Sequence, residues 1–280
     1  MRRPRTRWPA LALVGVTAAL SLSACGSGSG TGTQVLAWSD EFSGPAGSAP
    51  DPSSWNSITG GDGFGNQELE CYTSSRENSA LDGAGNLVIT ARNDPHHQCD
   101  GGRANDYTSA RLTTQKLHEF TYGTLSVRAK VPTGAGIWPA FWALGSNHDT
   151  AGWPRSGEID VSEVIGKANT VNHGSLHGPT KDGKPYTLTG TATASQDLGA
   201  DFHVYSVTWT RDSVSFSLDG KQFYSVSKDE VLRAGDWVFD QPFYLLLNVA
   251  VGGTWPGPPS GLTTWPQEMV VDYVRVYQDA

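Results

Sequence analysis

The sequence predicts an all-β fold of the sandwich or barrel class, on three observations. Gly, Pro, Asn and Asp interrupt the chain at short intervals from about Val35 onward, with β-branched and aromatic runs between them. This is the pattern of short strands joined by turns. Convincing amphipathic helices are missing. The 280 residues, of which 38% are hydrophobic and ten are Trp, can bury a sizeable core, and their uniform composition favours one domain.

Ten runs have the length and composition of strands. A tight hairpin turn is expected at Asp219-Gly220, inside the eighth run. One short helix is expected in "SKDEVLRAG", which begins at Ser227 and has Glu230 at capping-box spacing. The predicted strands are 86–92, 107–114, 122–131, 140–145, 158–165, 171–178, 203–210, 213–227, 243–251 and 270–278.

The N-terminus predicts export. Four Arg precede the apolar run "ALALVGVTAALSL", which is too short to span a bilayer but suits a signal peptide. The following "LSAC" resembles the processing site of bacterial lipoproteins, where the Cys, here Cys25, becomes the lipidated N-terminus; cleavage of an ordinary signal peptide nearby is the alternative. We expect residues 1–24 to be removed, residues 25–34 to form a lipid-anchored flexible linker, and residues 35–280 to fold at the outer face of the bacterial cell membrane.

The cysteine count agrees with lipidation. Three Cys are an odd number for an exported chain. Assigning Cys25 to a lipid leaves Cys71 and Cys99 free to form a disulfide, which an oxidising compartment permits.

Charge and motif content limit the class of partner. Without residues 1–24, which hold four Arg and no acidic residue, 16 basic residues face 28 acidic ones, a net charge of −12. Such a surface repels nucleic acid and anionic polymers and favours a neutral partner. The sequence has no Gly-rich phosphate loop, Cys/His metal cluster or internal repeat. We therefore expect a monomer that needs no cofactor for catalysis, binds no nucleic acid and contacts the membrane only through its lipid.

The stretch "SGEIDVSEVIG" places three carboxylates within six residues. Strand alternation puts Glu158 and Asp160 on one face but would point Glu163 into the core. Burying an unpaired carboxylate costs several kcal/mol. We therefore predict a one-residue β-bulge around Val161 and Ser162, which returns the third carboxylate to the face of the first two.

This arrangement suits glycosidic bond hydrolysis. With the bulge, the carboxyl groups of Glu158 and Glu163 approach to roughly 5–6 Å, and a retaining glycosidase uses about 5–5.5 Å against about 6.5–9.5 Å for an inverting one. An ionised carboxylate attacks, a protonated one serves the leaving oxygen, and Asp160 between them can hydrogen-bond the nucleophile. The alternative is a solvated acidic strand edge without a catalytic role. Like charges on one strand face destabilise the protein, so their presence favours a functional site.

Aromatic residues accompany the carboxylates. Trp138 and Trp142 lie four residues apart in "GIWPAFWALG", Trp153 precedes the acidic stretch, and Trp255 lies in the Gly- and Pro-rich "VGGTWPGPP". Indole faces suit the apolar faces of sugar rings, and the indole N–H can bind a hydroxyl. Core packing is the alternative, and it is weakest for Trp255 because of its loop.

Six segments together resemble glycoside hydrolase family 16, and most closely its bacterial laminarinase-type endo-β-1,3-glucanases. The resemblance covers roughly residues 38–278. It implies a β-jelly-roll sandwich of two antiparallel sheets with a concave substrate cleft, and retaining hydrolysis of a β-glucan polysaccharide. The segments are "YTSARLTT", "GIWPAFWALG", "GWPRSGEIDVSEVIG", "GSLHGP", "FYLLLNVAVGGTWPGPP" and "VDYVRVYQ".

The resemblance also implies residue roles. Glu158 resembles the nucleophile of the family, Asp160 its helper and Glu163 its acid/base, in the bulged form of the motif. Asn66 in "GFGNQELECYT" resembles a residue that lines the cleft, with a turn residue as the alternative. His177 in "GSLHGP" resembles a cleft histidine near the acid/base, with a structural strand histidine as the alternative.

A structural calcium ion is a further implication of the resemblance. Asp272, with the backbones near Glu41 and Gly85, resembles the site on the convex side, and oxygen ligands suit Ca²⁺. A hydrogen-bonding role for Asp272 is the alternative.

Two other functions stay open. One is a family relative that acts on mixed-linkage β-1,3-1,4-glucan or a galactan, although the net charge disfavours a sulfated polymer. The other is a non-catalytic glucan-binding surface protein, which would have no use for paired carboxylates.

Overall fold

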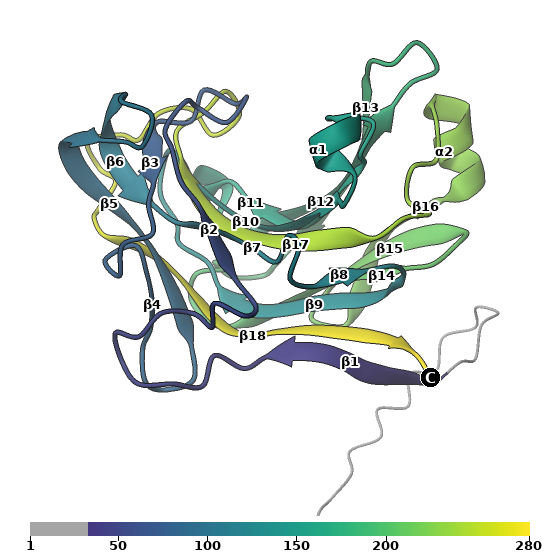
Figure 1. Cartoon of the computed structure of the whole chain (residues 1–280), viewed down its shortest axis with the longest axis horizontal. Coiled ribbons are helices and arrows are strands. Elements are labelled where there is room, and N and C mark those ends of the chain that lie inside the picture. Colours follow the sequence, from purple (N-terminus) through teal and green to yellow (C-terminus); the bar gives the residue numbers. More distant parts are fainter. Residues whose placement is uncertain (1–32) are drawn as a thin grey trace, which may run out of the picture. The chain divides into compact units, whose positions relative to one another are not determined.

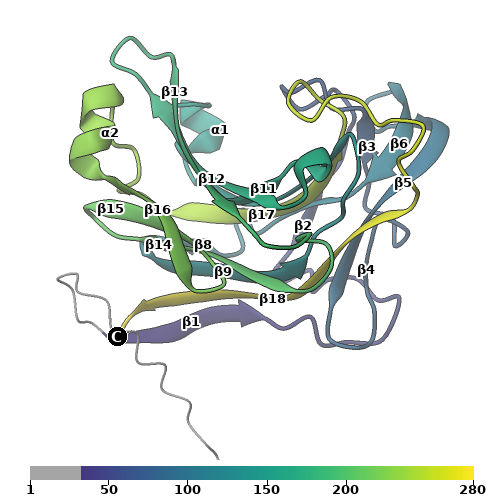
Figure 2. The same cartoon turned by 180° about the vertical axis from the view of Figure 1, so that it is seen from behind.

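Two curved β-sheets stack face to face in residues 33–280, the part of the chain that this computed structural model describes (Figures 1 and 2). The expected signal peptide, Cys25 and most of the expected linker lie outside the described residues. None of the described helices is long and apolar enough to cross a bilayer. The predicted all-β sandwich is confirmed.

The first sheet has ten strands. They are β1 (Gln34–Asp40), β3 (Glu70–Tyr72), β4 (Ser79–Leu81), β5 (Leu87–Gln98), β6 (Ala104–Ser109), β9 (Gly123–Lys130), β14 (His203–Trp209), β15 (Ser213–Leu218), β16 (Lys221–Ser227) and β18 (Gln267–Asp279). Their order is β16-β15-β14-β9-β18-β5-β6-β3, with β1 also paired to β18 and β4 to β5. The β3–β6 pair is parallel, and the other pairs are antiparallel.

The second sheet has eight antiparallel strands and forms the concave side of the sandwich (Figure 1). They are β2 (Asn56–Ile58), β7 (Arg111–Thr113), β8 (Glu119–Phe120), β10 (Ile137–Gly145), β11 (Glu158–Val164), β12 (Val171–Pro179), β13 (Pro185–Thr193) and β17 (Phe243–Val251). Their order is β13-β12-β11-β10-β17-β7-β2, and β8 also pairs with β17. Three short helices lie in the connections, namely α1 (His148–Ala151), η1 (Gly166–Ala168) and α2 (Lys228–Ala234).

The core lies between the two sheets. Along β11, Ile159, Val161 and Val164 are fully buried on the face opposite the cleft. The central β17 is buried along its whole length, because one face packs in the core and the other forms the floor of the cleft. At about 25 cal/mol per Å² of apolar surface removed from water, this core is the main favourable contribution to folding.

Nine of the ten predicted runs form strands, with differences at their ends. The run 107–114 instead divides into β6 and β7, which belong to different sheets, and the short or peripheral strands β1, β2, β3, β4 and β8 were not predicted. The eighth run forms β15 and β16, joined at Asp219-Gly220, where Asp219 has φ of 51°. The predicted helix is α2, and its capping box is formed by Ser227 and Glu230. The sequence did not predict β13, because its alternating Thr and small residues cover an edge strand that is only half buried.

A disulfide and a strand pairing join parts of the domain that are distant in the sequence. A disulfide joins Cys71 of β3 to Cys99, which follows β5, with Cα atoms 5.2 Å apart. Next to the C-terminus, Gln34 of β1 pairs with Asp279 of β18. Both ends of the described domain therefore lie together on the convex side, away from the concave sheet (Figure 1).

Candidate active site

The three carboxylates of β11 face one cleft because of a β-bulge. The neighbouring β10 pairs with Asp160 and then with Ser162, so Val161 is the extra residue. The pairing with β12 shifts at the same place, between Asp160 and Glu163. The predicted bulge is therefore present, and it places Glu163 on the same face as Glu158.

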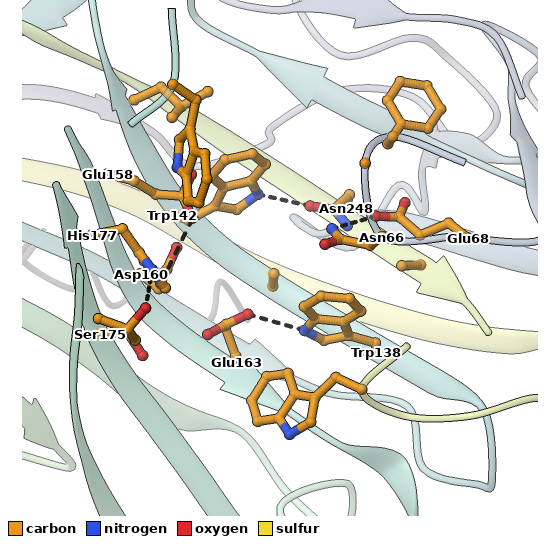
Figure 3. A pocket seen from close by; sticks show the side chains of 18 of the residues that line it. Asn66, Glu68, Trp138, Trp142, Glu158, Asp160, Glu163, Ser175, His177 and Asn248 are labelled. Carbon is orange, nitrogen blue, oxygen red and sulfur yellow. Dashed lines mark hydrogen bonds and ion pairs between the residues drawn. The ribbon is translucent and has the colours of Figure 1, made fainter. Parts of the chain in front are cut away.

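The cleft has a volume of about 800 Å³. Figure 3 shows Glu158, Asp160 and His177 together, with Glu163 and Trp138 beside them. The sequence-predicted carboxylates and sugar-facing residues all line this one cleft, namely Asn66, Trp138, Trp142, Trp153, Glu158, Asp160, Glu163, His177 and Trp255.

Burial dominates the electrostatics of the carboxylates. It raises the pKa of Glu158 to about 8 and that of Asp160 to about 7, and it holds the pKa of Glu163 well above its ordinary value. Repulsion from Asp160 raises the pKa of both glutamates further, whereas the charge of His177 lowers it. The cluster therefore retains protons at neutral pH, which suits a site that must donate one.

A tryptophan hydrogen bond orients Glu163. Trp138 Nε1 donates to Glu163 Oε1 at 3.1 Å, which stabilises the ionised form and lowers the pKa of this carboxyl group. Trp255 packs edge-on against Trp138, with ring centroids 5.4 Å apart. Trp255 is 41% exposed, so its surface is open to a ligand in the cleft.

His177 lies beside Glu158 and Asp160, not beside Glu163. Its Nε2 is 2.8 Å from Asp160 Oδ2 and 3.9 Å from Glu158 Oε1. The strand register pairs His177 with Glu158, whereas His173 pairs with Glu163. Side-chain alternation on β12 puts both histidines on the cleft face, four residues apart, and the charge of His177 also lowers the pKa of Glu163.

A chain of hydrogen bonds that the sequence did not predict lies at the other side of the cleft. Trp142 Nε1 donates to Asn248 Oδ1 at 2.8 Å, and Asn248 Nδ2 donates to the Tyr72 hydroxyl at 3.0 Å. That hydroxyl donates to Glu68 Oε2 at 3.0 Å, and Asn66 Nδ2 donates to Glu68 Oε1 at 3.0 Å. Through Tyr72 the chain connects the cleft floor to the loop that carries Asn66; Figure 3 shows its two ends, the Trp142–Asn248 and Asn66–Glu68 pairs.

Two further groups support this region. Burial, followed by the charge of Glu68, raises the pKa of Glu70 well above its ordinary value. The guanidinium of Arg111 stacks over the rings of Trp142 and Phe64, 4.7 and 5.2 Å from their centroids. The segment "GFGNQELECYT" contains Glu68, and its periodicity gave no sign that this side chain would face the cleft.

The side chains expected at a calcium site do not fit one. Arg128 Nη1 donates to Asp272 Oδ2 at 2.6 Å, and Arg275 binds both carboxylate oxygens of Glu41 at 2.9 and 2.7 Å. A guanidinium beside each carboxylate repels a second cation. The expected role of the backbones near Glu41 and Gly85 is not tested by these contacts, and we derive no role for calcium.

Comparison with known proteins gives consistent matches. The family model for glycosyl hydrolases family 16 matches residues 66–275. A β-glucanase from Rhodothermus marinus is 39% identical over 250 residues, which cover 87% of this chain and 85% of the relative. A glucan endo-1,3-β-glucosidase from Cryptopygus antarcticus is 37% identical over 253 residues, 86% of this chain and 91% of the relative. The laminarinase catalytic domain from Thermotoga maritima MSB8 superposes with a TM-score of 0.80 at 41% identity, over 88% of this chain and 99% of that domain.

The hydrogen-bond chain predicts the effect of Tyr72→Phe. The substitution keeps the buried ring but removes the Tyr72 hydroxyl that pairs with Glu68 Oε2 and Asn248 Nδ2, so we expect the free energy of unfolding to fall by about 1–3 kcal/mol. Denaturant titration measures this change. The matched control is Tyr244→Phe, since Tyr244 is buried beside Trp142 but is not a member of the chain. Equal stability of the two variants would contradict a supporting role for the chain.

Proposed function

Because the chain belongs to family 16 of the glycosyl hydrolases, we propose that it is a retaining, endo-acting hydrolase of β-1,3-glucosidic bonds in laminarin-like glucans. The names of the relatives from Rhodothermus marinus, Cryptopygus antarcticus and Thermotoga maritima support this substrate. The observation that carries the proposal is the arrangement of Glu158, Asp160 and Glu163 on one cleft face, with Val161 as the bulge residue.

The geometry supports a different role for each glutamate in the proposed reaction. Glu163 has a raised pKa and a fixed orientation, so it donates its proton to the glycosidic oxygen as that bond to the anomeric carbon breaks. An oxygen of Glu158 attacks the anomeric carbon and forms an ester with the sugar. Glu163 then takes a proton from water, the water oxygen displaces Glu158, and the product keeps the β configuration.

Neighbouring residues act in opposite directions on the charge of Glu158. The attacking oxygen must be ionised, and the charges of His177 and Arg111 lower the pKa of Glu158. Asp160 acts in the opposite direction, because its charge raises that pKa. A proton shared between Asp160 and His177, whose atoms are 2.8 Å apart, would reduce this repulsion.

Aromatic surfaces on both sides of the carboxylates support endo action. Trp153 is 47% exposed and lies near His177, with ring centroids 6.2 Å apart. Trp255 is 41% exposed and lies against Trp138, on the side of Glu163. Sugar rings can stack on both indoles, so a polymer that passes the carboxylates in either direction finds a binding surface.

Glu158→Gln and Glu163→Gln test the catalytic assignment. Each substitution keeps the shape of the side chain but removes a nucleophile or a proton donor, so we expect laminarin hydrolysis to fall by at least roughly 10²–10⁴-fold. Glu163→Gln should lose less on an aryl glucoside with a good leaving group, because that bond breaks without a proton. Circular dichroism checks that both variants fold.

The same assay separates the alternatives. Laminarin, mixed-linkage glucan, agarose and κ-carrageenan are incubated in parallel, and NMR follows the anomer that forms first. Release of β-anomeric oligosaccharides mainly from laminarin supports the proposal, and an initial α anomer would contradict retention. Binding of laminarin by the wild-type chain without any product would favour the glucan-binding alternative.

Trp138→Phe tests the pH dependence. Activity requires protonated Glu163 and is lost as the pH rises through its pKa. The indole N–H lowers that pKa, so its removal should raise the pKa and move the alkaline half-maximum of kcat/KM upward by roughly 0.5–1 pH unit, the equivalent of about 1 kcal/mol. The control is Trp255→Phe, which removes a cleft indole that packs against Trp138 and leaves the Trp138–Glu163 hydrogen bond in place. A downward shift, or equal shifts in both variants, would contradict the assignment.

We also propose export and anchoring through a lipid on Cys25. The Cys71–Cys99 disulfide supports an oxidising compartment. Cys25→Ser should move the protein from the membrane fraction to the medium, as immunoblotting of fractions would show. Wild-type protein found wholly in the medium would contradict the anchor.

A further inference from the structure

Three metal-type ligands converge on one point of the cleft. Among residues 33–280, the group whose candidate ligand atoms all lie within 4.8 Å of one another consists of Glu158, Asp160 and His177. His177 Nδ1 lies 2.9 Å from the Thr187 hydroxyl of β13, so this contact holds the ring. The opposite nitrogen, Nε2, is therefore directed at Asp160 and Glu158.

The interior oxygen of this group lacks an aligned donor. Asp160 is 3% exposed, and its Oδ2 has no hydrogen bond of normal geometry within the described residues, although His177 Nε2 is 2.8 Å away. A buried carboxylate oxygen without a partner is unfavourable by about 1–3 kcal/mol. An electropositive centre near Oδ2 and Nε2 would remove this penalty, and either a proton or a metal ion can supply it.

The donor set selects the class of metal. One imidazole nitrogen and two carboxylate oxygens suit Zn²⁺ or Cu²⁺, whereas Ca²⁺ and Mg²⁺ prefer oxygen alone. Zinc bonds of about 2.0–2.2 Å require only small movements of groups already this close. The hydroxyl of Thr187 on the other ring nitrogen is the kind of outer partner that orients metal-bound histidines. The side chains of Glu158 and His177 are each 19% exposed, so an ion can enter from the cleft.

We propose that Glu158, Asp160 and His177 form a binding site for a divalent transition cation, Zn²⁺ in the first instance, that reversibly inhibits the enzyme. Binding takes the lone pairs of Glu158 that would attack the sugar, and it places the ion where the substrate lies. The inhibitory consequence rests on the proposed hydrolase function, whereas the binding site itself does not.

Calorimetric titration of ZnCl₂ into the chelator-treated wild-type chain tests the site directly. We expect one Zn²⁺ per chain, with affinity at least about ten-fold weaker in His177→Gln, which loses the nitrogen ligand. The matched control is His173→Gln, because His173 lies on the same face of β12 but packs against Trp255, with ring centroids 4.9 Å apart. If His177→Gln fails to fold, Asp160→Asn removes another ligand and should weaken binding similarly.

Inhibition assays separate this inference from the proposed function. Zn²⁺ should inhibit laminarin hydrolysis by the wild type and by His173→Gln, and EDTA should reverse the inhibition, whereas the residual activity of His177→Gln should be much less sensitive. Zinc binding by a chain that hydrolyses no glucan would overturn the function but keep the site. Equal zinc affinity in the wild type, His177→Gln and Asp160→Asn, or no binding by the wild type, would overturn the site.

Discussion

The site depends on one extra residue in β11. Without the bulge at Val161, regular alternation would point Glu163 into the core on the same face as Ile159 and Val161, where an unpaired carboxylate is strongly unfavourable. The bulge also turns the Ser162 side chain away from the cleft, and its hydroxyl donates to Asn172 Oδ1 at 2.7 Å. A single backbone irregularity thus places all three carboxylates on the cleft side and gives the displaced hydroxyl a partner.

Burial at this site has two linked effects. It makes the ionised carboxylates less stable, which weakens the fold, and for the same reason it raises their pKa values. The N–H of Trp138 and the charge of His177 oppose both effects at Glu163. The balance keeps carboxyl groups of raised pKa within one cluster, which a fully solvated acidic strand edge could not maintain at neutral pH.

The sequence was most informative where periodicity and chemistry acted together. Alternation along β11, combined with the high cost of burying Glu163, was enough to locate the bulge and the three carboxylates. The partner of His177 could not be derived in this way, because strand register depends on which residues of β11 and β12 lie opposite each other. Edge strand β13 was not predicted for a different reason, because a half-buried run of Thr and small residues lacks a strong apolar pattern.

Long-range polar contacts were also beyond sequence reasoning. Tyr72 and Asn248 are 176 positions apart, yet they share a buried hydrogen bond. Local composition gives no indication of this hydrogen bond. The two residues meet because the fold brings β17, which carries Asn248, next to β3, which carries Tyr72. The same limit applies to the arginine partners of Glu41 and Asp272, which local sequence does not indicate.

The pairing of β1 with the end of β18 has a consequence for access. Gln34 and Asp279 lie side by side on the convex side, and the concave sheet opens in the opposite direction (Figure 1). The points where the chain enters and leaves the domain therefore lie on the side opposite the mouth of the cleft. A polymer that runs along the concave sheet past the carboxylates would not meet either of them.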